Sequence, residues 1–250
     1  MTTLFISDLH LTAGRPHITD LFFEFLEHEA RQARALYILG DFFEYWIGDD
    51  ALDQAEYRPI AERLRAVVDA GTPVHVMRGN RDFLLGARFE RESGCRLIED
   101  PTMIDLYGTP VLLMHGDTLC TDDVDYLAFR KMTRAESWQR DFLAKSPRER
   151  DAIAQNNREL SRQATARKAS EIMDVTQTAV AAVLREHGVR HLIHGHTHRP
   201  AEHVFDLDGA PATRTVLGDW YEHGSVLRVT VQGQRLERLA LKQQAAARSL

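Results

Sequence analysis

Residues 3–10 of the sequence read TLFISDLH, a short apolar run that ends in the polar side chains of Asp8 and His10. Four later segments repeat this arrangement: ALYILGDFFE at 35–44, PVHVMRGNRD at 73–82, PVLLMHGD at 110–117 and RHLIHGHTH at 190–198. Apolar runs of this length are typical of buried strands. Because ligands gather at the carboxyl ends of strands in open α/β sheets, we expect the five polar clusters to converge.

The sequence between these runs predicts helices, and the alternation of the two patterns indicates an α/β fold. Apolar residues recur at helical spacing in residues 21–26 and 60–68. After His198 the pattern changes to period two, which predicts antiparallel strands in residues 214–220, 225–232 and 235–241. We expect these later strands to form a second sheet packed on the first.

The chain is expected to divide into a core and an inserted cap. Residues 123–187 read mostly helical and lack the strand pattern of residues 1–122 and 188–250, which would form the core. Residues 124–170 contain 11 Lys/Arg and 6 Asp/Glu, so they carry +5, while the rest of the −6 chain carries −11. This asymmetry favours an anionic ligand at the cap, although a solvated helical face has the same composition.

Composition argues against several classes of protein. The net charge of −6 disfavours a nucleic-acid binder, because affinity for phosphate backbones comes from a surplus of Lys and Arg. The first 14 residues lack the features of a signal peptide, so we expect a protein that is not exported. No apolar run reaches the roughly 18 residues of a transmembrane helix. The two cysteines, Cys95 and Cys120, fit a reducing cytosol.

Ligand-type side chains stand two residues apart in the first and last clusters. If these segments are extended, Asp8 and His10 point to the same side, and so do His196 and His198. Imidazole and carboxylate ligands suit Mn, Fe or Zn, whereas Mg prefers oxygen alone, so we expect Mn²⁺ first. The histidines outside the motifs are expected to be structural: His17, His28, His75, His187, His191, His194, His203 and His223.

The five clusters contain the blocks DxH, GDxx(D/E), GN(H/R)(D/E), H and GHxH, and in this order they resemble the calcineurin-like metallophosphoesterase superfamily. The resemblance implies a two-sheet β-sandwich flanked by helices and a site for two metal ions. The ligands of one ion would be Asp8, His10, Asp41 and His198. The ligands of the other would be Asp41, Asn80, His115 and His196. Two neighbouring ions can clamp a phosphate and lower the pKa of bound water toward neutrality.

Arg81 occupies a position at which the superfamily more commonly has His. The planar guanidinium can hold two oxygens of a phosphate or diphosphate and stabilise the charge that develops in the transition state. We therefore expect Arg81 to be catalytic. The alternative is that it only pairs with its neighbour Asp82.

Longer stretches resemble one branch of the superfamily, the UDP-2,3-diacylglucosamine hydrolases of lipid A synthesis. These stretches are SDLHL at 7–11, LGDFFEYWIGDD at 39–50, RGNRDFLLG at 78–86, LMHGDTLCTDD at 113–123, NRELSRQATARKASEIMDV at 157–175 and HGHTHRPA at 194–201. The resemblance implies Mn-dependent attack of water on the α-phosphorus of UDP-2,3-diacylglucosamine. The products would be UMP and 2,3-diacylglucosamine 1-phosphate (lipid X). Activity is expected at the cytoplasmic face of the inner membrane, without a required protein partner.

The same resemblance implies a set of substrate contacts in the core and the cap. These are Asn80, Arg81, Asp123, Ser161, Thr165, Lys168 and His196. Thr165 departs from the family, where Asn is usual, so its contact is the least secure. Ser161 and Lys168 are two helical turns apart, which places them on one face with Thr165 close by.

Large apolar residues in the insertion could enclose acyl chains or form an ordinary helical core. They are Val124, Leu127, Phe129, Met132, Trp138 and Phe142. Two alternatives to the lipid substrate stay open. One is a phosphodiesterase or phosphatase of the same superfamily that acts on a soluble nucleotide or phosphoprotein. The other is a binding scaffold that kept the fold and lost catalysis.

Overall fold

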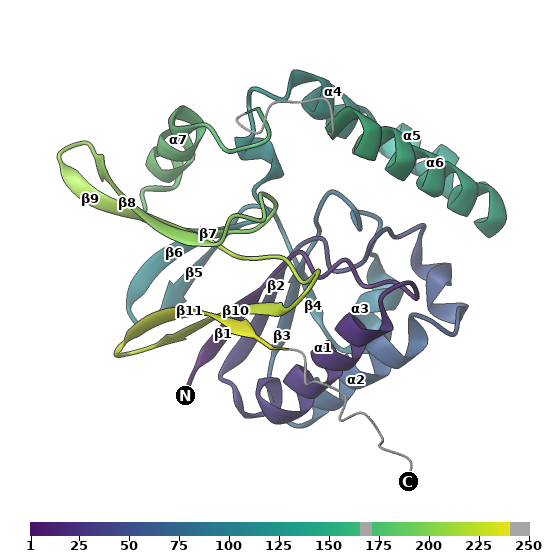
Figure 1. Ribbon diagram of the computed structural model, residues 1–250, viewed down its shortest axis with the longest axis horizontal. Helices are drawn as coiled ribbons and strands as arrows, with labels where there is room; N and C mark the ends of the chain where they lie inside the picture. The colour runs from purple at the N-terminus through teal and green to yellow at the C-terminus, as the bar shows by residue number, and fades with distance from the viewer. Residues whose placement is uncertain (166–171, 241–250) are drawn as a thin grey trace, which may run out of the picture.

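The computed structural model of the protein describes residues 1–165 and 172–240, which form two packed β-sheets with helices on their outer faces (Figure 1). The first sheet has the strand order β11-β10-β1-β2-β3-β4 and the second has the order β5-β6-β7-β9-β8. The strands are β1 (Thr3–Ile6), β2 (Ala35–Leu39), β3 (Val74–Met77), β4 (Arg96–Ile98), β5 (Thr102–Leu106), β6 (Thr109–Met114), β7 (His191–His194), β8 (Ala201–Leu207), β9 (Ala210–Val216), β10 (Gly224–Thr230) and β11 (Gly233–Leu239). The α-helices are α1 (Pro16–His28), α2 (Arg58–Asp69), α3 (Ala87–Ser93), α4 (Val124–Thr133), α5 (Glu136–Leu143), α6 (Pro147–Thr165) and α7 (Gln177–His187), and the 3-10 helices are η1 (Ala30–Gln32), η2 (Asp49–Asp53) and η3 (Asp117–Leu119).

The alternation of side chains along each strand explains the layers of the core. Phe5 of β1 belongs to the buried cluster between the two sheets, together with Leu113 and Ile193 of the second sheet. Its neighbours Leu4 and Ile6 belong instead to the cluster that the first sheet forms with α1 and α2. Because successive side chains of a strand point to opposite faces, one short apolar run supplies both layers.

Helices cover both outer faces of the sandwich. The helices α1, α2 and α3 lie on the first sheet (Figure 1). Pro16 begins α1, where its missing N–H would have no partner within the helix. On the second sheet, Val180 and Leu184 of α7 are buried in one cluster with Leu112 and Leu192. The result is a four-layer arrangement of helix, sheet, sheet and helix.

The expected α/β class with two packed sheets is confirmed, but the expected membership of the sheets is partly wrong. The predicted strands β6 and β7 lie in the second sheet, not in the first. The later strands β10 and β11, expected in the second sheet, extend the first one, because β10 pairs antiparallel with β1 from Thr3↔Val229 to Phe5↔Leu227. The periodicity of apolar residues along a strand indicates which of its faces are buried, but it does not indicate which sheet the strand joins.

The helices α4, α5 and α6 form a separate group at one end of the sandwich (Figure 1). The expected insertion 123–187 also includes α7, which packs on the second sheet as described above. The division into core and cap therefore remains a prediction, and we use the name cap for α4, α5 and α6.

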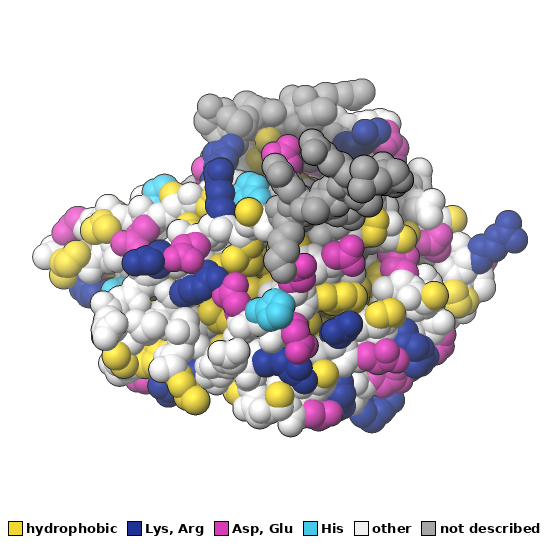
Figure 2. Space-filling view, turned by 60° about the horizontal axis from the view of Figure 1, so that its bottom comes forward, with side chains coloured by type: hydrophobic (Ala, Val, Ile, Leu, Met, Phe, Trp, Pro, Cys, Tyr) yellow, Lys and Arg dark blue, Asp and Glu magenta, His cyan; other side chains and the backbone are white. Residues whose placement is uncertain are grey.

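Among the described residues no helix is long and apolar enough to cross a membrane. Figure 2 shows basic and acidic side chains interspersed over one face of the molecule, so the described part of that face has no single sign of charge.

Candidate metal centre

Five loops bring the polar clusters together, each after the carboxyl end of β1, β2, β3, β6 or β7. Backbone hydrogen bonds hold neighbouring loops to one another. The Asp8 N–H donates to the carbonyl oxygen of Gly40 at 3.0 Å, and the Gly195 N–H donates to that of His115 at 2.9 Å. Neighbouring strands within each sheet therefore place residues that are far apart in the sequence at one edge.

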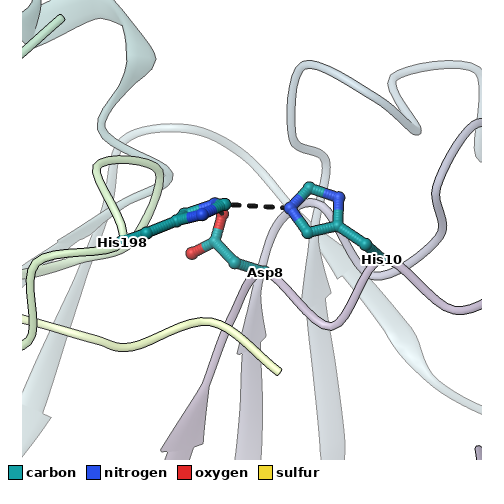
Figure 3. A group of neighbouring side chains, drawn as sticks. All are labelled: Asp8, His10 and His198. Atoms are coloured by element: carbon teal, nitrogen blue, oxygen red, sulfur yellow. Dashed lines mark hydrogen bonds and ion pairs between the residues drawn. The ribbon is translucent and has the colours of Figure 1, made fainter. Parts of the chain in front are cut away.

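The first group of ligand-type side chains is Asp8, His10 and His198, whose candidate ligand atoms all lie within 4.8 Å of one another. His10 Nε2 lies 3.3 Å from His198 Nε2, which lies 3.4 Å from Asp8 Oδ1. Figure 3 shows the carboxylate of Asp8 beside the line that joins the two rings. Asp8 and His10 come from the segment after β1, and His198 comes from the loop after β7.

The second group is Asp41, His115 and His196, whose candidate ligand atoms also lie within 4.8 Å of one another. Asn80 joins this group, because its Oδ1 lies 2.9 Å from both His115 Nε2 and His196 Nδ1. His115 Nδ1 lies 2.9 Å from the carbonyl oxygen of Leu39. A carbonyl oxygen can only accept, so Nδ1 carries the hydrogen and Nε2 is the atom that can bind a cation.

Asp41 lies between the two groups. Its Oδ2 is 3.9 Å from His10 Nε2, and its Oδ1 is 3.6 Å from His115 Nε2. The backbone N–H of Arg81 donates to Oδ1 at 2.8 Å and so fixes the orientation of the carboxylate. One buried carboxylate therefore faces both groups, as a bridging ligand has to.

The donor set fits divalent cations. Asp8 Oδ1 is buried and receives no hydrogen bond from the described residues, whereas Oδ2 accepts from Ser7 Oγ at 2.5 Å and from the His196 N–H at 2.9 Å. In the second group, the Asn80 amide can donate to His115 Nε2 and His196 Nδ1, each 2.9 Å away. A cation would satisfy the buried Asp8 Oδ1, which has no donor among the described residues.

The backbone of the ligand loops is left-handed, which corrects the expectation of extended ligand pairs. Asp8, His10, Asp41, His196 and His198 have φ values of 56°, 48°, 50°, 68° and 55°. Residues other than glycine rarely adopt this conformation. Asp8 and His10 reach the first group through this left-handed backbone, not because they share one face of a strand. His196 and His198 do not reach one site, because His196 belongs to the second group and His198 to the first.

Close approach explains two glycines of the motifs. A Cβ atom on Gly79 would lie 2.2 Å from the backbone nitrogen of Asp41, and one on Gly195 would lie 2.3 Å from Asp8 Oδ2. Side chains do not approach so closely, so any other residue would push the ligand loops apart. The glycines of the GN and GH blocks are therefore needed for packing around the two aspartates.

Burial and neighbouring charges retain protons in the centre when no cation is bound. Burial raises the pKa of Asp41 to about 7, although the charge of His115 opposes this shift. Burial acts to lower the pKa of His115, but the charges of Asp41, Asp117 and Asp8 raise it to about 9. Burial also lowers the pKa of His196 to about 4, so this ring is neutral at pH 7. The Asp41–His115 pair then holds at least one proton at pH 7.

Binding of a divalent cation such as Mn²⁺ at pH 7 is expected to release about one proton per chain, because the cation displaces the proton of the Asp41–His115 pair. The raised pKa of His115 means that the proton competes more strongly as the pH falls, so cation affinity should rise with pH up to about 9. Calorimetry in two buffers of different ionisation enthalpy measures the number of protons. Cation binding without proton release would contradict this protonation state.

Arg81 pairs with Asp41 and Glu44, so the alternative in which it pairs with Asp82 is wrong. Its Nε lies 3.7 Å from Asp41 Oδ2, and its Nη1 lies 3.5 Å from Glu44 Oε1. Asp82 instead accepts hydrogen bonds from the backbone N–H groups of Gly79 and Phe42, both at 2.7 Å. Asp82 ties the loop after β3 to the loop after β2, and the guanidinium of Arg81 faces the metal centre.

Glu44 and Tyr221 complete the surroundings of the first group, and the sequence did not predict either of them as a site residue. Glu44 Oε2 lies 3.6 Å from His10 Nδ1, and Glu44 Oε1 accepts from Arg158 Nε at 2.8 Å. The ring of Tyr221 is parallel to that of His10, with centroids 5.4 Å apart and an interplanar angle of 5°. Glu44 could have been found as the last residue of the GDxx(D/E) block, whereas no motif contains Tyr221.

A cavity of about 350 Å³ lies between the metal centre and the cap. Asn80 and Arg81 line it on the side of the second group. Trp138 and Phe142 belong to its apolar wall and stack with ring centroids 4.9 Å apart. The volume is within the usual range of small-molecule sites, and an apolar wall beside a few polar groups is the usual lining.

Five of the six apolar residues expected in the cap fall into two sets, and the sixth, Leu127, is half-buried and does not line the cavity. Phe129, Trp138 and Phe142 line the cavity. Val124 and Met132 are 70% and 51% exposed and lie on the outer surface. The cap therefore has apolar side chains both toward the cavity and toward solvent, which neither a purely solvated helical face nor an ordinary core would need.

Four of the predicted substrate contacts line the cavity: Asn80, Arg81, Asp123 and Ser161. Asp123 also caps α4, because its Oδ1 accepts from the Tyr126 N–H at 3.2 Å. His196 belongs to the second group of ligand-type side chains. Thr165 ends α6, but its side chain lies outside the described part of the chain, as does the whole of Lys168.

Comparison with known proteins adds family relationships to this geometry. The family model described as calcineurin-like phosphoesterase matches residues 1–200. A UDP-2,3-diacylglucosamine hydrolase from Pseudomonas aeruginosa (strain UCBPP-PA14) is 55% identical over 237 residues, which cover 94% of this chain and 98% of the relative. The protein of the same name from Stenotrophomonas maltophilia (strain K279a) is 52% identical over 247 residues, covering 96% of this chain and 99% of the relative. A solved dimetal phosphatase from Danio rerio has a TM-score of 0.51 at 13% identity, covering 96% of this chain and 99% of that one, a likeness that shows the fold alone.

Proposed function

The chain belongs to the calcineurin-like phosphoesterases, and within them to the UDP-2,3-diacylglucosamine hydrolases, and from this premise we propose that it hydrolyses the diphosphate bond of UDP-2,3-diacylglucosamine. Water attacks the α-phosphorus, and the bond between this phosphorus and the bridging oxygen breaks. The oxygen of the water is retained in UMP, and the bridging oxygen leaves with 2,3-diacylglucosamine 1-phosphate. The reaction is a step of lipid A biosynthesis.

One observation carries this proposal: Asn80 and Arg81 border both the second metal group and the apolar cavity. A substrate with a charged diphosphate and two acyl chains needs a cationic centre and an apolar enclosure side by side. The diphosphate would lie at Asn80 and Arg81, and the acyl chains would lie against Phe129, Trp138 and Phe142. A soluble nucleotide would leave this wall in contact with water, at a cost that grows with the apolar area exposed.

The seven ligand-type side chains are proposed to hold two ions. Asp8, His10 and His198 would bind the first ion, and Asn80, His115 and His196 the second, with Asp41 shared. When bound, the ions supply positive charge to the phosphate and an activated water as nucleophile. His196 would also touch the substrate. Further contacts to the substrate are proposed at Asp123, Ser161, Thr165 and Lys168.

Arg81 is proposed to be the catalytic residue that binds the diphosphate oxygens. Its backbone N–H is fixed on Asp41 Oδ1, and its guanidinium is steered by Glu44 at 3.5 Å. A positioned guanidinium stabilises the charge on the phosphate oxygens as the bond to the leaving group breaks. Glu44 also lies beside His10 and Arg158. It therefore links the guanidinium of Arg81 to the first metal group and to α6.

We propose Mn²⁺ as the native metal. Four imidazoles beside two carboxylates and one amide suit Mn, Fe or Zn better than Mg. Purified protein supplied with Mn²⁺ is expected to release UMP from UDP-2,3-diacylglucosamine, with the nucleotide measured by chromatography and the metal by elemental analysis. The absence of UMP release while two ions per chain are bound would refute the proposed function.

The alternative substrate is a soluble nucleotide or phosphoprotein, and the variant Trp138→Asp separates it from the lipid. A carboxylate in the apolar wall is expected to raise KM for UDP-2,3-diacylglucosamine by roughly 10- to 100-fold, because burying a large side chain contributes about 1.5–3 kcal/mol. The more conservative Trp138→Phe should lie between this variant and the wild type. Unchanged KM in Trp138→Asp, with folding checked by circular dichroism, would favour the soluble substrate.

We propose that the protein acts at the cytoplasmic face of the inner membrane through the outer surface of the cap. This surface has exposed Val124 and Met132 together with exposed basic residues such as Lys131 and Arg140. Such a combination favours anionic lipid surfaces. Sedimentation with phosphatidylglycerol vesicles should exceed that with phosphatidylcholine vesicles and should fall in Met132→Glu. The matched variant Val204→Glu, at an exposed position of β8, should bind as the wild type does, and equal losses in both variants would contradict the proposal.

A further inference from the structure

Resting on the proposed function, we propose that the hydrogen bond from Tyr126 to Asp117 positions the α4 wall of the cavity relative to the second metal group. Asp117 and Tyr126 are then positioning residues for the lipid part of the substrate. Neither belongs to the seven ligand-type side chains or to the predicted substrate contacts.

Asp117 lies in the loop that supplies His115 and accepts hydrogen bonds from α4. It follows His115 by two residues, lies in η3 and is 1% exposed. Its Oδ2 accepts one hydrogen bond from the hydroxyl of Tyr126 and a second from Arg130 Nε at 2.7 Å. Both donors belong to α4 and stand four residues apart, on one face of the helix. Hydrogen bonds to a buried carboxylate are among the stronger ones in proteins.

A second contact ties α4 to another ligand loop. Arg134, the residue after α4, donates from Nη2 to the carbonyl oxygen of Gly79 at 2.9 Å, next to Asn80 in the chain. The same guanidinium lies 4.0 Å from the ring centroid of Phe83. The helix is therefore attached to two of the four loops that supply the second group, the loop of His115 and the loop of Asn80.

Polar contacts fix α4 because apolar packing does not. Thr133 is the only buried residue within this helix, whereas α1 and α2 each bury four or more side chains. Nevertheless α4 supplies Tyr126, Phe129 and Thr133 to the cavity wall. A wall with little packing behind it depends on its anchors for its position. A shift of about 1 Å in such a wall is enough to spoil the fit of a bound substrate.

The variant Tyr126→Phe tests the proposal, because it removes one hydroxyl and keeps the ring that lines the cavity. We expect KM for UDP-2,3-diacylglucosamine and the Kd of 2,3-diacylglucosamine 1-phosphate to rise roughly tenfold, with kcat within about twofold of the wild type. The stoichiometry of bound Mn²⁺, measured by calorimetry, should be unchanged. Asp117→Asn keeps an oxygen that can accept from Tyr126 and should recover most of the affinity that Asp117→Ala loses. The matched control is Tyr37→Phe, whose ring stacks on Phe5 and His75 away from the cavity.

Three results would overturn the proposal. The first is a Kd and a KM in Tyr126→Phe that match those of the wild type and of Tyr37→Phe. The second is a lower kcat at unchanged KM, which a smaller folded fraction would produce. The third is a loss of bound Mn²⁺, which would mean that the bond supports the ligand loop and not the wall. If the wild type itself releases no UMP, the proposed function fails and this inference fails with it.

Discussion

Asp41→Asn is expected to lower kcat for UMP release by at least roughly 1,000-fold and to reduce the number of bound Mn²⁺ ions below two per chain. Asp41 faces both groups, with its carboxylate oxygens 3.9 Å from His10 Nε2 and 3.6 Å from His115 Nε2. Loss of a shared anionic ligand removes several kcal/mol of charge stabilisation in the transition state. Asparagine tolerates the left-handed backbone of this position, so the loop should keep its shape.

The matched control for this variant is Asp20→Asn, which changes an exposed carboxylate on α1. It should have the kcat and the metal content of the wild type. Elemental analysis and UMP release are measured on the same preparations. Two ions per chain and wild-type kcat in Asp41→Asn would show that the two groups do not share this ligand.

Arg81→Ala is expected to lower kcat by roughly 100- to 1,000-fold while both metal groups keep their ions. This magnitude is typical for removal of one donor that stabilises developing charge. The metal centre should be retained because Arg81 contacts Asp41 Oδ1 through its backbone N–H, which every substitution at this position except proline preserves. Arg81→Lys should recover only part of the rate, since a single ammonium cannot reproduce the planar fork of a guanidinium.

The matched control here is Arg88→Ala, because Arg88 forms ion pairs with Asp53 and Glu92 on the surface. Surface ion pairs contribute little to stability, so this variant should keep wild-type kcat and metal content. Single-turnover measurements separate the chemical step from product release. Wild-type kcat in Arg81→Ala would mean that the guanidinium does not contact the diphosphate during the reaction.

The sequence predicts the convergence of the five clusters because their order and their place after apolar runs are local features. The runs that precede Asp8, Asp41, Asn80, His115 and His196 are all strands in the structure. The parallel strands β1, β2 and β3 end at one edge of the first sheet, and the parallel strands β6 and β7 end at one edge of the second. The packing of the two sheets brings these two edges together. The expectation that the ligand pairs lie in extended segments is nevertheless wrong, since a spacing of two residues does not distinguish a strand from left-handed backbone.

Other features depend on contacts that no local pattern contains. The strand β10 joins the first sheet through its pairing with β1, more than 200 residues earlier in the chain. The role of Tyr221 beside His10 and that of Asp117 beneath α4 likewise arise only once distant segments meet. The helical pattern of the cap predicted its helices but not that α7 would pack on the second sheet.

The left-handed backbone at five of the proposed metal ligands restricts which residues can replace them in descendants of this protein. A descendant that no longer hydrolyses phosphate esters does not need imidazole and carboxylate side chains at these positions. Its backbone still has to adopt the same left-handed conformation there. Glycine and asparagine are the residues that tolerate this conformation at least cost. Relatives that have become inert scaffolds should therefore have Gly or Asn at the positions equivalent to Asp8, His10, Asp41, His196 and His198, and alanine there should be uncommon.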